Sequence, residues 1–316
     1  MKPDKLKLIL FSLSAFIFWS CSSEPADFGE QYKKTLYIVN SRDMLYVGEH
    51  AYGSENNSMS FSIYCASSEP IKSDLTVQLA INPNALDSLN KKSALGNPLY
   101  IDKKLLPEAN YTSTDLSVTI PANAQYGVLH IPLKPQGLDP DISYALPLTI
   151  VSNSEGYDVN EELKTMVYEV KMVNGFSGNY AGSSIELPKT IRSVQPTLKA
   201  MSSNSVRMPI HSLSGEARYI KTNFMLLTIG ADSTSVTIKP WLDAQITDLG
   251  KSTYDKTRQS FYLRYSYTDA DGKTFDIEEK ILKKRKYFNN KDYEKQFKNP
   301  TNYPPNMENK RCTFSS

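Results

Sequence analysis

The sequence predicts an all-β protein made of two antiparallel domains. Three observations support this: short runs in which apolar and polar residues alternate, a hairpin pattern near residue 270, and a glycine-rich segment between two groups of runs. Alternation with a period of two places every second side chain on one face of a strand, which is typical of half-buried strands. A length of 316 residues agrees with two domains.

The first group of runs lies between residues 35 and 173. In residues 74–82, Leu75, Val77 and Leu79 fall on one face, as in a half-buried strand. Residues 84–92 predict a short helix with Asn84 as its N-cap. Several short strands at close spacing predict an antiparallel sandwich. The other strand-like runs are residues 35–40, 59–67, 116–133, 143–152 and 165–174.

The second group begins after residues 174–183, which hold three glycines and are predicted to be the hinge between the domains. The clearest signal is in residues 260–282. One face carries Phe261, Leu263, Tyr265 and Tyr267, the turn is Asp-Ala-Asp-Gly, and Phe275, Ile277 and Glu279 alternate back, which predicts a hairpin. A row of such hairpins forms an antiparallel meander or a small barrel.

The start of the chain predicts a secretory signal. Three lysines precede an apolar run over residues 8–19, and Ser20 stands directly before Cys21. The run is shorter than the roughly 20 residues that span a bilayer. A small residue followed by cysteine resembles the lipobox of bacterial lipoproteins, whose cysteine is lipidated. We therefore expect a signal over residues 1–20, a lipid on Cys21 and a tether over residues 21–34; the alternative is a cleaved signal with a free cysteine.

A lipidated Cys21 predicts an outer-membrane location. Glu24 and Asp27 resemble a weak form of the acidic tag that exports such proteins to the cell surface, so we expect the protein to face the exterior. The periplasmic leaflet remains the alternative.

Charge and cysteine content restrict the possible functions. The net charge of +2 is too small to attract nucleic acid electrostatically, so nucleic-acid binding is not expected. After Cys21 only Cys65 and Cys312 remain, and they could pair in an oxidising compartment. Because one lies in a strand-like run and the other in a polar terminus, we favour two free thiols.

Motifs in both halves resemble one known family. Residues 115–156 resemble the N-terminal domain of a large family of Bacteroidetes surface lipoproteins, in which a strand ends on Ile-Pro-Ala-Gly-like residues and a later strand reads Tyr-x-Leu-Pro-x-x-Ile. Here these motifs fall at residues 120–122 and 144–150, with Asn123 where the family often has glycine. Residues 105–111 fit as well. This domain also precedes endo-N-acetylglucosaminidase catalytic domains, as an Ig-like accessory module.

The second half resembles the usual C-terminal companion of that domain, a lipocalin-like domain of unknown function. The likeness lies in residues 173–183 and 260–282. The resemblance implies an Ig-like antiparallel β-sandwich over residues 35–173 and a lipocalin-like antiparallel β-barrel over residues 174–316. The basic, aromatic tail from Lys283 is either an arm packed on the barrel or a partly ordered end.

Motifs for catalysis are weak. The histidines His50, His130 and His211 lack metal-ligand spacing, so no metal site is expected. Gly-Phe-Ser-Gly at residues 175–178 lacks the last glycine of a nucleophile elbow. Gly-Lys-Ser-Thr at residues 250–253 lacks the upstream glycine of a phosphate loop, so a turn is expected. Carboxylates from different strands could still flank a glycosidic bond.

Binding to sugars is better supported. Aromatic rings can stack on the C–H faces of sugars, and polar side chains beside them can bond the hydroxyls. The candidates are Trp241, Tyr254, Tyr262 and Arg264. Trp241 could equally lie in the core or at its rim, and Tyr262 and Arg264 could be ordinary solvent-facing strand residues.

The resemblance implies a cell-surface lipoprotein of a polysaccharide-utilisation system. We expect non-catalytic glycan binding, no cofactor, and a TonB-dependent transporter with its substrate-capturing lipoprotein as possible partners. One alternative is a structural docking partner of the transporter complex that binds no sugar. A less favoured alternative is a glycoside hydrolase.

Overall fold

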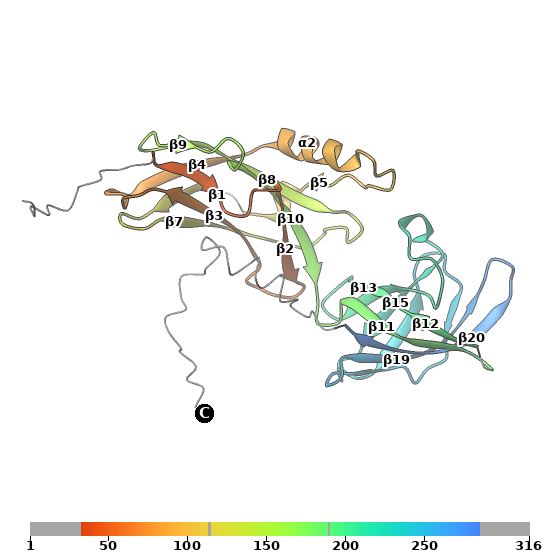
Figure 1. Ribbon diagram of the computed structural model, residues 1–316. Coiled ribbons are helices and arrows are strands. Elements are labelled where there is room, and N and C mark those ends of the chain that lie inside the picture. The colour runs from red at the N-terminus through yellow and green to blue at the C-terminus, as the bar shows by residue number, and fades with distance from the viewer. Residues whose placement is uncertain (1–32, 113–114, 189, 285–316) are drawn as a thin grey trace, which may run out of the picture. The chain divides into compact units, whose positions relative to one another are not determined.

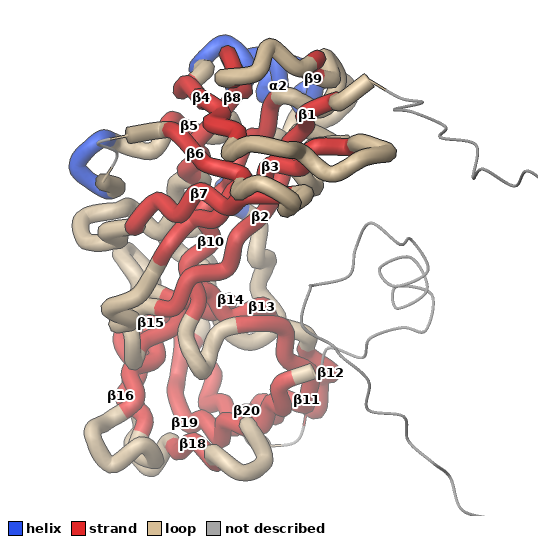
Figure 2. The backbone as a smooth tube through the Cα atoms, turned by 90° about the vertical axis from the view of Figure 1, so that its left-hand side faces the viewer, coloured by secondary structure: helices blue, strands red, loops and turns tan. Residues whose placement is uncertain are grey.

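A computed structural model describes residues 33–112, 115–188 and 190–284, and strands dominate the described chain (Figures 1 and 2). The chain divides into two compact units between Met172 and Val173, with residues 51–53 joined to the second unit. The predicted signal, Cys21, the tether up to residue 32 and the tail from residue 285, which includes Cys312, lie outside the described residues. Within the described part, no helix has the length and apolarity needed to cross a membrane.

The first unit is a β-sandwich of two mainly antiparallel sheets, as predicted (Figure 1). One sheet has the order β7-β3-β1-β9, and the other has the order β2-β10-β8-β4-β6 with β5 beside β8. The strands are β1 Thr35–Ile38, β2 Leu45–Ala51, β3 Ser58–Ala66, β4 Leu75–Ile81, β5 Lys104–Leu105, β6 Ser117–Ile120, β7 Tyr126–Pro132, β8 Tyr144–Asn153, β9 Asp158–Val159 and β10 Thr165–Val173.

The core of the sandwich follows the predicted alternation. Leu75, Val77 and Leu79 of β4 are buried between the sheets, and Cys65 of β3 is buried with them. Strands β6 and β7 belong to different sheets, so the Pro-Ala-Asn segment between them carries the chain across the sandwich. There Asn123 has φ of 64°, a left-handed conformation that asparagine tolerates better than most residues and that glycine adopts freely.

The helix begins earlier than predicted. Helix α2 spans Pro83–Ala94, and its N-cap is Asn82 without a side-chain capping bond. The Asn82 side chain instead donates to the Thr149 hydroxyl at 3.1 Å, so tertiary contact replaces the cap expected at Asn84. Pro83 suits the first helical position because no amide hydrogen is needed there. A short 3₁₀ turn, η1, follows at Glu108–Asn110.

The second unit is a nearly closed antiparallel barrel, as the resemblance implied. The strand order is β16-β15-β14-β13-β11-β20-β19-β17, with β12 on β11 and β18 on β19. The elements are β11 Gly178–Glu186, β12 Thr190–Val194, β13 Thr197–Ala200, β14 Ser205–Pro209, η2 Ala217–Tyr219, β15 Phe224–Ile229, β16 Val236–Pro240, β17 Ile246–Asp248, β18 Thr253–Asp255, β19 Ser260–Thr268 and β20 Thr274–Lys283.

Backbone bonds at β16 and β18 bring the two ends of the barrel sheet together. Ser235 and Thr253 form an antiparallel bridge, and the Val236 amide donates to the Ser252 carbonyl at 3.1 Å. The predicted hairpin is β19 and β20, and the face that begins with Phe261 and Leu263 is buried inside the barrel. Closed pairing leaves few open edges, which protects the sheet from pairing with other chains.

The predicted hinge includes part of the barrel wall. Strand β11 begins at Gly178, and Gly182 faces β20 so closely that a Cβ would collide with the Lys280 carbonyl oxygen. Glycine is therefore required there for close strand approach rather than for flexibility.

Candidate functional site

Tyr254 is not available to a ligand, which corrects the prediction. It is 5% exposed, and its ring lies 4.7 Å from that of Phe261 and 5.0 Å from that of Phe176, measured between centroids. Tyr254 belongs to β18, whose short pairing with β19 turns this side chain into the barrel. It is a core residue and cannot stack on a sugar.

Trp241 is half-buried, and part of its ring packs against a buried side chain. It follows β16, and the guanidinium of the buried Arg207 lies 4.9 Å from its ring centroid. Phe224 lies 5.4 Å from the same guanidinium. The rings of Trp241 and Phe224 thus hold a buried cation by cation–π attraction. The interpretation of Trp241 as a sugar-binding residue stays a prediction.

Tyr262 and Arg264 lie together on the outer face of β19. Tyr262 is 38% exposed, and Arg264 is half-buried, with its Nε 3.2 Å from Glu278 Oε1. Residues two apart on a strand point to the same face, so the aromatic ring and the ion pair are neighbours. Of the four sequence candidates, these two share one exposed surface.

The strand register extends this surface into a row across five strands. Tyr262 lies opposite Thr253 on one side and Lys280 on the other, and Lys280 lies opposite Ser183, which lies opposite Ser193. All five side chains are exposed. With strands about 4.8 Å apart, the row spans about 19 Å. We call these five residues the outer row; it offers hydroxyls, a cation and a ring to an extended polar chain.

A polar cluster inside the barrel was missed by the sequence reasoning. Glu279 is fully buried, and its Oε2 accepts a hydrogen bond from the Tyr265 hydroxyl at 2.7 Å. The Tyr265 oxygen accepts from the His211 amide at 3.0 Å, and Ser184 Oγ lies 2.7 Å from His211 Nδ1. Burial raises the pKa of Glu279 to about 7, while hydrogen bonding from Tyr265 and Ser184 opposes the rise. The sequence did contain one signal for this cluster, because Glu279 is a charged residue at an inward-facing position of an alternating strand.

This cluster does not have the geometry of a hydrolase triad. A serine nucleophile needs a histidine on its hydroxyl and an acid on the other ring nitrogen of that histidine. Here Glu279 bonds Tyr265, and His211 Nε2 has no partner among the described residues. Ser184 is also fully buried, and its hydroxyl is bonded to His211 Nδ1. The cluster is a polar part of the core rather than a nucleophilic site.

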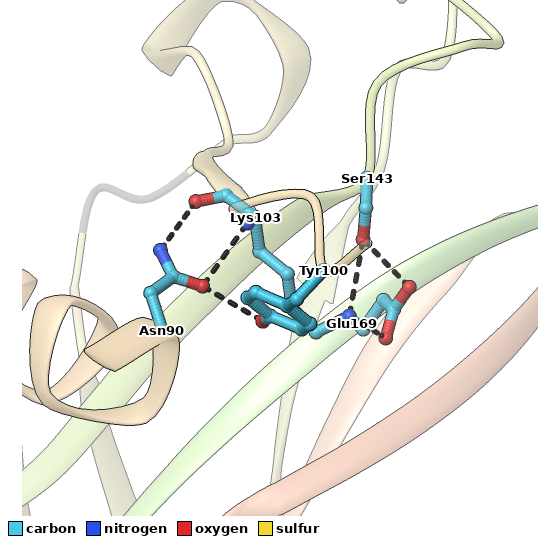
Figure 3. A network of polar contacts seen from close by, with 5 residues as sticks. All are labelled: Asn90, Tyr100, Lys103, Ser143 and Glu169. Atoms are coloured by element: carbon cyan, nitrogen blue, oxygen red, sulfur yellow. Dashed lines mark hydrogen bonds and ion pairs between the residues drawn. The ribbon is translucent and has the colours of Figure 1, made fainter. Parts of the chain in front are cut away.

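The main polar network of the sandwich also supports structure (Figure 3). Asn90 of α2 donates to the Lys103 carbonyl at 2.9 Å and accepts from the Lys103 amide at 3.0 Å and the Tyr100 hydroxyl at 2.9 Å. Lys103 Nζ lies 2.8 Å from Glu169 Oε2, and Ser143 donates to Glu169 at 2.6 Å. These side chains satisfy one another's hydrogen-bonding groups. They hold the segment after α2 against the sheet.

The three histidines do not come together. His50 is buried with its Nε2 3.2 Å from the Tyr168 hydroxyl, His130 Nδ1 lies 3.0 Å from Ser60 Oγ on a sheet surface, and His211 lies in the barrel. No group of three or more metal-ligating side chains occurs in residues 33–112, 115–188 and 190–284.

Comparison with known proteins agrees with this architecture. Residues 32–156 match the N-terminal domain model of a protein family, and residues 164–282 match a C-terminal domain model. No curated protein matches the chain.

Several solved structures have the same fold. A multidomain protein from Bacteroides ovatus that includes a domain of unknown function is 19% identical, with a TM-score of 0.57 over 80% of this chain and 93% of that one. A protein of unknown function from the same organism is 16% identical, with a TM-score of 0.56 over 78% and 90%. An auxiliary nutrient binding protein from Bacteroides thetaiotaomicron is 14% identical, with a TM-score of 0.50 over 74% and 89%. At these identities the likeness concerns the fold. From the two domain matches and the shared two-domain architecture, the chain belongs to the family that its sequence resembles, in which an Ig-like β-sandwich precedes a lipocalin-like barrel.

Proposed function

We propose that this protein is a non-catalytic glycan-binding protein, anchored to the outer membrane by a lipid on Cys21 and facing the exterior. The outer row carries the proposal, because it places an exposed ring beside hydroxyls and a cation on neighbouring strands. The Bacteroides relative that is an auxiliary nutrient binding protein supports the same class of function.

The proposed mechanism is capture. A sugar face stacks on Tyr262, while Lys280 and the hydroxyls of Thr253, Ser183 and Ser193 bond its hydroxyl groups. Each contact is weak, so several contacts along one polysaccharide and several copies at the membrane are needed for retention. A nearby TonB-dependent transporter would then meet a raised local concentration of its substrate.

The test is calorimetry or affinity gel electrophoresis against a broad polysaccharide panel. The Tyr262→Ala variant should bind the retained polysaccharide about tenfold more weakly, which corresponds to about 1.4 kcal/mol. Tyr126→Ala is the matched control, because Tyr126 is 39% exposed but lies on β7 of the sandwich. Equal affinity of both variants and the unaltered protein, or no retention by any polysaccharide, would contradict the proposal.

The anchor has a separate test. Labelled palmitate should attach to the protein in cells and fail to attach to a Cys21→Ala variant, which should appear in the medium or periplasm. Labelling that persists in the variant would show that the lipid is elsewhere.

A further inference from the structure

Five side chains converge at one end of the barrel, above the buried polar cluster. Glu186 follows Ser184 by two residues on the inner face of β11, and Arg192 of β12 lies opposite Ser184 in the ladder. Tyr267 and Phe275 lie opposite each other at the tip of the β19–β20 hairpin, and His211 comes from the loop after β14. We call these five residues the barrel-end group.

The rings of the barrel-end group form a column. The centroids of Phe275 and Tyr267 are 5.3 Å apart with the planes 23° from parallel, and those of Tyr267 and His211 are 6.0 Å apart. Lys273 Nζ lies 4.4 Å from the centroid of Phe275 on the hairpin. Each ring of the column therefore already has another ring or a cation as a neighbour.

The charged members act on both polar rings. Burial lowers the pKa of His211, Arg192 lowers it further, and Glu186 raises it. Burial raises the pKa of Tyr267, as does Glu186, while Arg192 lowers it. Glu186 and Arg192 therefore both lie within electrostatic reach of His211 and of Tyr267.

One ring nitrogen of this group has no use within the described protein, although His211 Nδ1 is bonded to Ser184 Oγ. His211 Nε2 is buried and has no hydrogen-bond partner among the described residues, which is rare for a buried ring nitrogen. The described chain also contains no ion pair between Glu186 and Arg192, although they have opposite charge and both face this end. His211 is held with φ of 47°, and strained backbone of this kind concentrates at functional sites.

We propose that the barrel-end group binds a neutral ligand with several hydroxyl groups, of the size of one sugar unit. A hydroxyl can donate to Glu186 and to an unprotonated His211 Nε2, and it can accept from Arg192. Because Glu186 and Arg192 carry opposite charges, their effects on a ligand with a net charge oppose each other, so the pair gives an ion little net attraction. Because each ring already has a ring or a cation beside it, hydrogen bonds are favoured over stacking for recognition.

This site goes beyond the proposed function, because it lies on the inner face of the barrel and takes a single unit, whereas the outer row takes an extended chain. The mouth of a β-barrel is a common place for small-ligand sites, where a few convergent polar groups set specificity. Either site can fail without the other.

The test uses glucose, galactose, mannose and N-acetylglucosamine as probes, with saturation-transfer NMR and calorimetry. At least one should bind at about 10 mM, which would nearly saturate a site with a Kd of 1 mM. Glu186→Gln and Arg192→Gln keep side-chain size and remove charge, so each should weaken binding about tenfold. The ¹⁵N resonance of His211 Nε2 should shift on addition of the sugar to the unaltered protein.

Tyr262→Ala is the control that separates the two sites, since it should keep monosaccharide binding and lose polysaccharide binding. The proposal is overturned if none of the four sugars binds. It is also overturned if both charge-removing variants bind as the unaltered protein does, or if the His211 resonance stays unchanged at saturation.

Discussion

The buried carboxyl of Glu279 should make the stability of the barrel depend on pH. Its pKa in the folded protein is about 7, against an ordinary value of 4.5. The folded state therefore holds the proton more tightly than the unfolded state. The contribution of this group to stability is fully present below pH 4.5 and is lost as the pH rises to about 7. At about 1.4 kcal/mol per pKa unit, the loss is about 3 kcal/mol.

A Glu279→Gln variant removes this dependence. Glutamine is neutral at every pH, and its side-chain oxygen can still accept from Tyr265. We expect the free energy of unfolding of the unaltered protein to fall relative to that of the variant by up to about 3 kcal/mol between pH 4.5 and pH 7. Above that range the difference should stay constant.

Trp241 provides the assay. The chain has two tryptophans, so in a Trp19→Phe background urea unfolding followed by fluorescence reports on the barrel. A second variant checks the cause. Tyr265→Phe removes a hydrogen bond that lowers the pKa of Glu279, so the fall in stability should extend to higher pH. Parallel pH curves for the unaltered protein and Glu279→Gln would refute the reasoning.

Three further substitutions test the packing. Asn90→Ala should destabilise the sandwich by about 2 kcal/mol and speed amide hydrogen exchange in the segment after α2, because three hydrogen bonds are lost. Gly182→Ala should lower the stability of the barrel by about 1–3 kcal/mol in urea unfolding, whereas Gly175→Ala, with open space around it, should not. Trp241→Ala should destabilise the barrel by about 2 kcal/mol in thermal unfolding, since it uncovers Arg207.

Most of the fold followed from alternation. The hairpin prediction rested on Phe261, Leu263 and Tyr265, and these side chains are buried as expected because a period of two leaves little freedom in register. The helix boundary was less predictable. Asn84 and Asn82 are both suitable N-caps, and the choice depends on where Thr149 lies in a strand far along the chain.

The site residues were harder to predict. Alternation with Phe261 already places Tyr262 on the outer face, whereas Tyr254 follows an expected turn, and only its pairing opposite Phe261 turns it into the barrel. Glu279 was correctly assigned to the inward face, but its burial depends on Tyr265 from the neighbouring strand and His211 from a distant loop. Contacts between residues so far apart in the chain cannot be predicted from the spacing of residues within one strand.

The alternation that builds the barrel also separates the two proposed sites. On β11, Ser183 of the outer row and Ser184 below the barrel-end group are consecutive and point to opposite faces. Variants on the two faces share no contacts, so their effects should add. A Tyr262→Ala, Arg192→Gln double variant should therefore lose polysaccharide binding as Tyr262→Ala does and monosaccharide binding as Arg192→Gln does. If either substitution changed the other ligand's affinity by tenfold, the two surfaces would have to be one coupled site, and the division between inner and outer recognition would fail.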